Sequence, residues 1–190
     1  MTQHAPLFIV LLPVSAALLC MLFSRIQKNL GSWIVIASIA GAFLSAVSSL
    51  QQVIADGGKA LHYWMGNWQP PLGIEFVIDP ISGALAVLIT FIALLGSLYS
   101  LPFVKEEGWL HIGGYYTLYG LMTVGMCGMV ITGDVFNLYV FLEVMSLSGY
   151  GLIAIGGKKS MLAAFRYLLI GTIGASLYLL GVGYMYALTG

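Results

Sequence analysis

Charged side chains are scarce in this sequence. Its 190 residues include seven Lys or Arg and seven Asp or Glu, so that 7% are charged while 60% are hydrophobic. Soluble domains average roughly 25% charged and 45–50% apolar residues, and a soluble fold of this size could not cover its surface with so few charges. The composition therefore excludes a soluble globular domain and predicts an integral membrane protein.

Cysteine and the common motifs of catalysis are also scarce or lacking. Cys20 and Cys127 each lie alone in an apolar run, and His62 has no second metal-ligand candidate at a useful spacing. This pattern excludes a disulfide framework or a zinc site and predicts that both cysteines are packing residues. The sequence contains no Gly-rich phosphate loop, haem-attachment motif or nucleophile motif, and its formal charge of zero suggests no nucleic-acid partner. We predict no cofactor, no metal and no active site of the chain's own.

Long apolar runs make up most of the chain. A helix needs roughly 20 apolar residues to cross a bilayer core, whereas an open sheet would leave backbone groups unpaired in lipid. The first run has no basic n-region and no cleavage site, so we expect it to remain as a helix rather than act as a signal peptide. The predicted fold class is all-α, a polytopic bundle in one membrane domain (1–190) with six transmembrane helices at 6–23, 32–54, 79–101, 111–131, 134–155 and 160–188.

Local signals indicate where three of these helices begin. Asp79 followed by proline places the proline at the first helical position. The apolar run from 111 to 155 is too long for one span, and Thr132-Gly133-Asp134 divides it, with Asp134 as the expected cap of the second span. Ser160 is the expected N-cap of the last helix.

Basic residues in the short loops predict the orientation. One side of the membrane carries a single lysine, Lys59. The loops on the other side carry Arg25, Lys28, Lys105, Lys158 and Lys159. We therefore expect those three loops in the cytoplasm and both termini outside it, in a multi-pass protein of the cell inner (plasma) membrane.

The one long loop, 55–78, is expected to lie outside and to form a short β-hairpin. Its second arm alternates as a strand does, and its centre is rich in Gly, Pro and Asn, which is turn chemistry. We expect four aromatic side chains at the level of the lipid headgroups, Tyr63, Trp64, Trp68 and Phe76. Two interpretations stay open: an aromatic belt that only anchors the chain, or a docking surface for a neighbouring subunit.

Glu143 is the charge that a membrane environment makes costly. It lies nine residues after Asp134, about 13–14 Å along a helix axis and near the bilayer midplane. A carboxylate there is strongly unfavourable unless it is paired, solvated or protonated. Its neighbours at i−4, i+3 and i+7 are Tyr139, Ser146 and Tyr150, so the spacing predicts a hydroxyl-lined stripe on the same helix face. Two roles stay open, a proton relay and a protonated residue that holds helices together.

Arg166 is the candidate cation partner of this carboxyl group. It lies six residues after Ser160, roughly 9 Å inside the cytoplasmic end of the last helix. It either snorkels to the interface as a topology anchor or points inward to a water-filled half-channel. Lys158 and Lys159 are expected to be solvated loop residues.

Three segments resemble one family of membrane subunits. They are residues 63–79, which lead into a helix that begins with Asp-Pro, residues 133–143 with the sequence GDVFNLYVFLE, and residues 163–169 with the sequence AAFRYLL. Together they resemble the antiporter-like subunits shared by respiratory complex I, Mrp-type Na+/H+ antiporters and energy-converting membrane-bound hydrogenases, with the D-type subunits of the Mrp antiporters as the most similar branch. The resemblance spans essentially the whole chain, and its Phe-Leu-Glu segment is the most specific part.

This resemblance implies roles for two residues. In the family the glutamate of the fifth helix takes part in proton translocation, and Glu143 matches it, whereas relatives often carry Lys where this chain has Arg166. The family has about fourteen helices, with a catalytic lysine on a broken seventh helix and a second inverted repeat beyond it. This chain matches only the first six helices.

The resemblance also implies a function and partners. It implies the N-terminal portion of a proton- or cation-translocating subunit, in an antiporter or in an ion-pumping oxidoreductase of the quinone-reductase or hydrogenase type. The alternative is a non-conducting structural or assembly subunit, or a truncated fragment. The implied partners are the lipid bilayer, H+, Na+ as a further candidate, and other integral membrane subunits, one of which would supply the later helices.

Overall fold

The computed structural model describes residues 4–27, 29–68, 73–104 and 109–189, and in these ranges it contains six long helices and one two-stranded sheet. The helices are α1 (Ala5–Ile26), α2 (Leu30–Ala55), α3 (Pro80–Val104), α4 (Trp109–Ile131), α5 (Val135–Ala154) and α6 (Lys158–Thr189), and the strands are β1 (Leu61–Trp64) and β2 (Glu75–Ile78). Each helix contains an apolar stretch long enough to cross a membrane. The predicted all-α bundle of six membrane-spanning helices is confirmed. Lys28, Lys105 and residues 69–72 of the predicted turn (67–72) lie outside the described residues.

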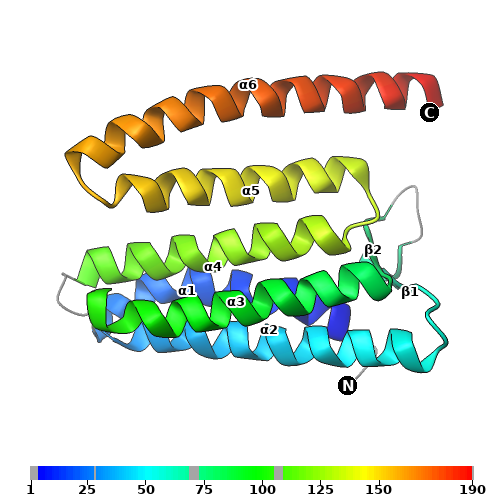
Figure 1. The fold of residues 1–190 in the computed structure, drawn as a ribbon, viewed down its shortest axis with the longest axis horizontal. Helices are drawn as coiled ribbons and strands as arrows, with labels where there is room; N and C mark the ends of the chain where they lie inside the picture. Colours follow the sequence, from blue (N-terminus) through cyan, green and yellow to red (C-terminus); the bar gives the residue numbers. More distant parts are fainter. Residues whose placement is uncertain (1–3, 28, 69–72, 105–108, 190) are drawn as a thin grey trace.

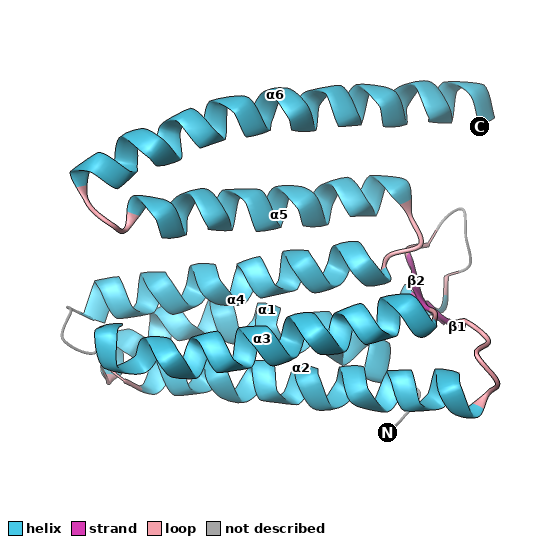
Figure 2. Ribbon diagram, in the orientation of Figure 1, coloured by secondary structure: helices cyan, strands magenta, loops and turns pink. Residues whose placement is uncertain are grey.

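The helices run up and down, so that both chain ends and the small sheet lie at the same end of the bundle (Figure 1). Helix α1 packs against α2 and α4, and α3 also packs against α2 and α4. Helix α5 packs on α4 and α6 packs on α5, which leaves α6 at the outer edge (Figures 1 and 2). We call α1–α4 the four-helix group, and α5 with α6 the two-helix flank.

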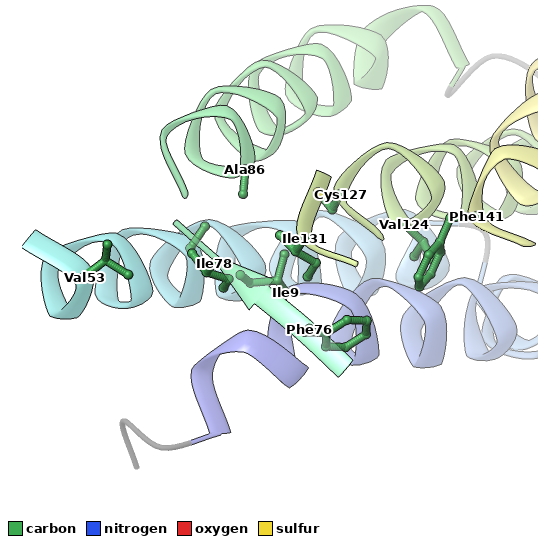
Figure 3. Packing of buried hydrophobic residues seen from close by; sticks show 10 residues of the cluster. Ile9, Val53, Phe76, Ile78, Ala86, Val124, Cys127, Ile131 and Phe141 are labelled. Carbon is green, nitrogen blue, oxygen red and sulfur yellow. The ribbon is translucent and has the colours of Figure 1, made fainter. Parts of the chain in front are cut away.

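Two apolar clusters fill the interior of the bundle. One lies near the sheet and joins the four-helix group to β2 and to Phe141 of α5 (Figure 3). The other lies among α1, α2, α3 and α4 and includes Ile39 and Tyr116. The hydroxyl group of Tyr116 lies 3.0 Å from the Ser100 hydroxyl and donates to the backbone carbonyl of Ser97 over 3.2 Å. Polar groups inside the four-helix group therefore find their partners within it.

The predicted β-hairpin between the second and third helices is confirmed. Strands β1 and β2 pair antiparallel, with Trp64 opposite Glu75. The expectation that Phe76 lies at the headgroup level is wrong, because its side chain is 2% exposed and its ring centroid lies 6.3 Å from that of Phe141. Alternate residues of a strand point to opposite faces, so β2 turns Phe76 into the bundle, whereas Trp68 stays 63% exposed.

The starts of α3 and α6 show how local chemistry places a helix end. The Asp79 carboxylate accepts a bond from the Ser82 backbone N–H over 2.6 Å, and the Ser82 hydroxyl accepts one from the Asp79 N–H over 2.8 Å. These bonds form a reciprocal cap, and the bond from the Ser82 backbone contributes most to holding the pKa of Asp79 below its ordinary value. The predicted N-cap Ser160 is wrong: α6 begins two residues earlier, at Lys158, because Gly157 turns the chain there with a φ of 99°.

Candidate functional site

Glycines of α4 allow α5 to pack closely on the four-helix group. A side chain at Gly128 would overlap the ring of Phe141, and one at Gly125 would overlap Met145. Small residues permit such close approach between membrane helices. Glu143 follows Phe141 by two positions, about 200° around the helix, and therefore lies on the opposite side of α5, toward α6.

The first turn of α5 is held by side chains of the connection between α4 and α5. Asp134 is the N-cap, as predicted, because its carboxylate accepts a bond from the Asn137 backbone N–H over 2.6 Å. The buried Asn137 side-chain amide donates to the Thr132 hydroxyl over 2.9 Å. These bonds fix the N-cap of α5 nine residues before Glu143.

Glu143 itself is half-buried on α5. Among the residues that the structure describes, it makes no hydrogen bond and no ion pair. A carboxyl group in the middle of a membrane helix requires a proton, water or a cation. The described part of the chain supplies no cation for it.

The predicted neighbours of Glu143 lie where α5 meets α6. Tyr139 stacks on Tyr178 of α6, with ring centroids 6.2 Å apart and an interplanar angle of 7°. Tyr150 meets Tyr167 of α6 edge to face, with centroids 4.8 Å apart and an angle of 79°. Ser146 and Tyr167 line an open groove of about 360 Å³ together with methionines of α4 and α5. By helical spacing Glu143 shares the face of α5 that carries these residues.

The structure does not bring Arg166 to Glu143. Arg166 is exposed, and it forms no ion pair with Glu143 in the described chain. Helix α6 meets α5 through Tyr167 and Tyr178. Because Arg166 precedes Tyr167 by one position, its side chain lies about 100° around the helix from that contact.

A polar network at the hairpin was missed by sequence reasoning. Nδ1 of His62 lies 2.7 Å from Oε1 of Glu75, and the Trp64 indole N–H donates to the same oxygen over 2.9 Å. The backbone carbonyl of Glu75 accepts a bond from the Gly133 N–H over 2.9 Å. Since Gly133 directly precedes Asp134, the network ties the hairpin to the start of α5.

Two aromatic residues of this site were also missed. Tyr167 and Tyr178 are eleven positions apart, close to three helical turns. That spacing places both rings on one face of α6 and was the available signal. Which helix the face would meet could not be inferred from it.

Comparison with known proteins adds to this geometry. A family model described as "NADH:quinone oxidoreductase/Mrp antiporter, TM" matches residues 132–190, which include α5 and α6. The N subunit of the NADH-quinone oxidoreductase of Desulforudis audaxviator (strain MP104C) is 43% identical over 190 residues, 100% of this chain. The D-type subunit of the Na(+)/H(+) antiporter of Bacillus subtilis (strain 168) is 31% identical over 182 residues, 95% of this chain. Over nearly its whole length the chain is therefore similar to these antiporter-like subunits.

A solved structure of a membrane complex contains a chain with the same fold. The membrane-bound sulfane sulfur reductase, an archaeal respiratory membrane complex, contains a chain that matches 99% of this one with a TM-score of 0.90 and 30% identity. The present chain spans 38% of that chain, and 38% and 36% of the two relatives named above. It therefore corresponds to little more than a third of the antiporter-like proteins that it resembles.

Proposed function

We propose that this chain is the N-terminal portion of a proton- or cation-translocating membrane subunit in which Glu143 relays protons. The observation that carries the proposal is a half-buried carboxyl group, without a partner in the described chain, on a helix long and apolar enough to cross a membrane. A Gln or Asn would hold helices together without the free-energy cost of a buried charge. The family relationship to antiporter subunits supports the same role.

The supporting residues have separate roles in this proposal. The Glu143 carboxylate takes up a proton at one oxygen and releases it again, which requires access to water. In this proposal Ser146, which lines a groove one helical turn from Glu143, helps water to reach the carboxyl group, and Tyr139 and Tyr150 flank it on the same face of α5. Arg166 acts from the exposed side of α6, as an anchor that snorkels toward the cytoplasmic interface.

The partners proposed are H+, with Na+ as a further candidate, the lipid bilayer and other integral membrane subunits. Only 11% of the apolar window of α6 and 22% of that of α5 are buried within the described chain, so both helices have faces available to further helices. One such subunit or segment would supply the later helices of the family. We place the chain in the cell inner membrane with both termini outside the cytoplasm, because five basic residues lie in or next to the connections on the opposite side.

Proton flux in membrane vesicles, normalised to assembled subunit, tests the relay. Glu143→Gln keeps the shape of the side chain but removes the proton site, so flux should fall at least about tenfold while assembly persists. Glu143→Asp should retain a fraction of the flux. The matched control is Asp56→Asn, a change at an exposed carboxylate at the end of α2, which should leave flux unchanged. Undiminished flux in the Glu143→Gln variant would leave the structural or assembly role as the better account.

A further inference from the structure

Two tyrosine pairs join α5 to α6, one on each side of Glu143 along the helix axis. Tyr139 stacks on Tyr178, and Tyr150 meets Tyr167. Tyr178 is half-buried and Tyr167 is 53% exposed, while the buried hydrophobic residues in the described part of α6 are the smaller Ala164, Ala175 and Val182. The aromatic pairs are therefore the large, specific contacts between the two helices.

The two pairs specify a single register. Helices α5 and α6 are antiparallel (Figure 1), so a step forward along one corresponds to an equal step back along the other. From Tyr139 to Tyr150 and from Tyr178 to Tyr167 the step is the same eleven residues. The same register sets Val135 opposite Val182, and these two side chains do line one pocket.

In this register the residue level with Glu143 along the helix axis is Gly174. Gly174 is exposed, and a Cβ atom there would meet nothing within 4 Å, so at this level α6 adds no side chain beside the carboxyl group. A slip of one helical turn in either direction would set Ile170 or Tyr178 opposite Glu143 and cover it. The Tyr178 hydroxyl also donates to the Val135 carbonyl over 3.2 Å, which opposes such a slip.

We propose that Tyr167 and Tyr178 are positioning residues for Glu143. Their rings hold α6 in the register that keeps Gly174 opposite the carboxyl group and so leaves Glu143 open to proton exchange. This inference rests on the proposed relay function and adds two residues of α6 to it. Stacked and edge-to-face rings contribute beyond their buried area, and a small displacement of a reacting group is enough to lower a rate strongly.

Proton flux in the assembled complex tests the positioning role with matched variants. Tyr167→Leu and Tyr178→Leu remove the ring contacts and should lower flux per assembled subunit at least about fivefold. Tyr167→Phe and Tyr178→Phe keep the rings and should stay within about twofold of wild type. The control is Tyr184→Leu, the same change at an α6 residue that is 65% exposed and should leave flux unchanged. Loss of flux in the Phe variants equal to that in the Leu variants would overturn a role for the rings.

Cross-linking separates a failure of this inference from a failure of the relay. In a variant with Cys20→Ala and Cys127→Ala, a cysteine pair at Val135 and Val182 should cross-link efficiently, and Tyr178→Leu should reduce the yield severalfold. Unchanged cross-linking and flux in the Leu variants, with flux abolished in Glu143→Gln, would overturn the positioning role and leave the relay intact. Undiminished flux in Glu143→Gln would overturn both.

Discussion

The four-helix group and the two-helix flank differ in whether a central polar side chain has a hydrogen-bond partner. In the first, the Tyr116 hydroxyl is buried and bonded to groups of α3. In the second, Glu143 has no partner among the described residues. The buried share of the apolar stretch is 28–44% in α1–α4, 22% in α5 and 11% in α6. The first region is thus a self-contained scaffold, and the second presents its chemistry on a surface that the described chain leaves partly uncovered.

Contacts at the junction between the two regions explain how the four-helix group positions α5. Glycines of α4 seat Phe141 and Met145, and the hairpin bonds through Glu75 to Gly133 just before α5. The scaffold therefore controls the depth and rotation of α5. Within the described ranges it makes no comparable set of contacts with α6, which packs on α5.

Two matched isoleucine truncations test the difference between the four-helix group and the two-helix flank. They have the largest expected effect on stability. Ile39→Ala removes a side chain that is 0% exposed in the four-helix group, whereas Ile170→Ala removes one that is 72% exposed on α6. The first should lower the free energy of unfolding by about 1–3 kcal/mol, because a cavity remains while the unfolded helices stay in lipid or detergent. The second should change it by only a few tenths of a kcal/mol. Unfolding in detergent measures both, and equal losses would contradict the division into two regions.

The capping residue at the junction should show an intermediate effect. Asp134→Ala removes the acceptor of the Asn137 N–H and should destabilise α5 by about 1 kcal/mol. Asp134→Ser supplies another capping oxygen and should recover most of the loss. Hydrogen exchange of the first turn of α5 reports the change locally. A turn equally protected in the Ala variant would show that contacts with α4 alone hold the start of this helix.

The smallest expected effect is a pH dependence confined to the scaffold. The lowered pKa of Asp79 means that its charged form stabilises the folded chain above the ordinary carboxyl pKa, and that this contribution is lost as the pH falls through the lowered value. The thermal stability of the protein in detergent should therefore decline below about pH 4. Asp79→Asn should flatten that decline, since an amide caps the helix without titrating. An identical pH profile in the two proteins would assign the decline to other carboxyl groups.

The sequence alone was enough to predict the six spans, the hairpin and the starts of α3 and α5. Apolar runs of membrane-spanning length, and turn residues such as Thr132-Gly133-Asp134, act through local chemistry that needs no neighbour in space. Two local predictions were wrong because neighbouring residues or strand pairing had the larger effect. Ser160 is a good N-cap residue, yet the left-handed Gly157 starts α6 earlier. Phe76 is a typical interface aromatic, yet the pairing of β2 turns it into the core.

What the sequence by itself determined is the face of α5 that carries Glu143, because residues three, four and seven positions apart must share one side of a helix. What only the tertiary structure decided is what that face meets. The partner helix, its register and the glycine opposite the carboxyl group depend on how α6 returns after the Gly157 turn, and on ring contacts between tyrosines as much as 39 positions apart in sequence. Spacing along a chain specifies direction around one helix axis. It carries no information about the relative placement of two helices, which packing alone sets.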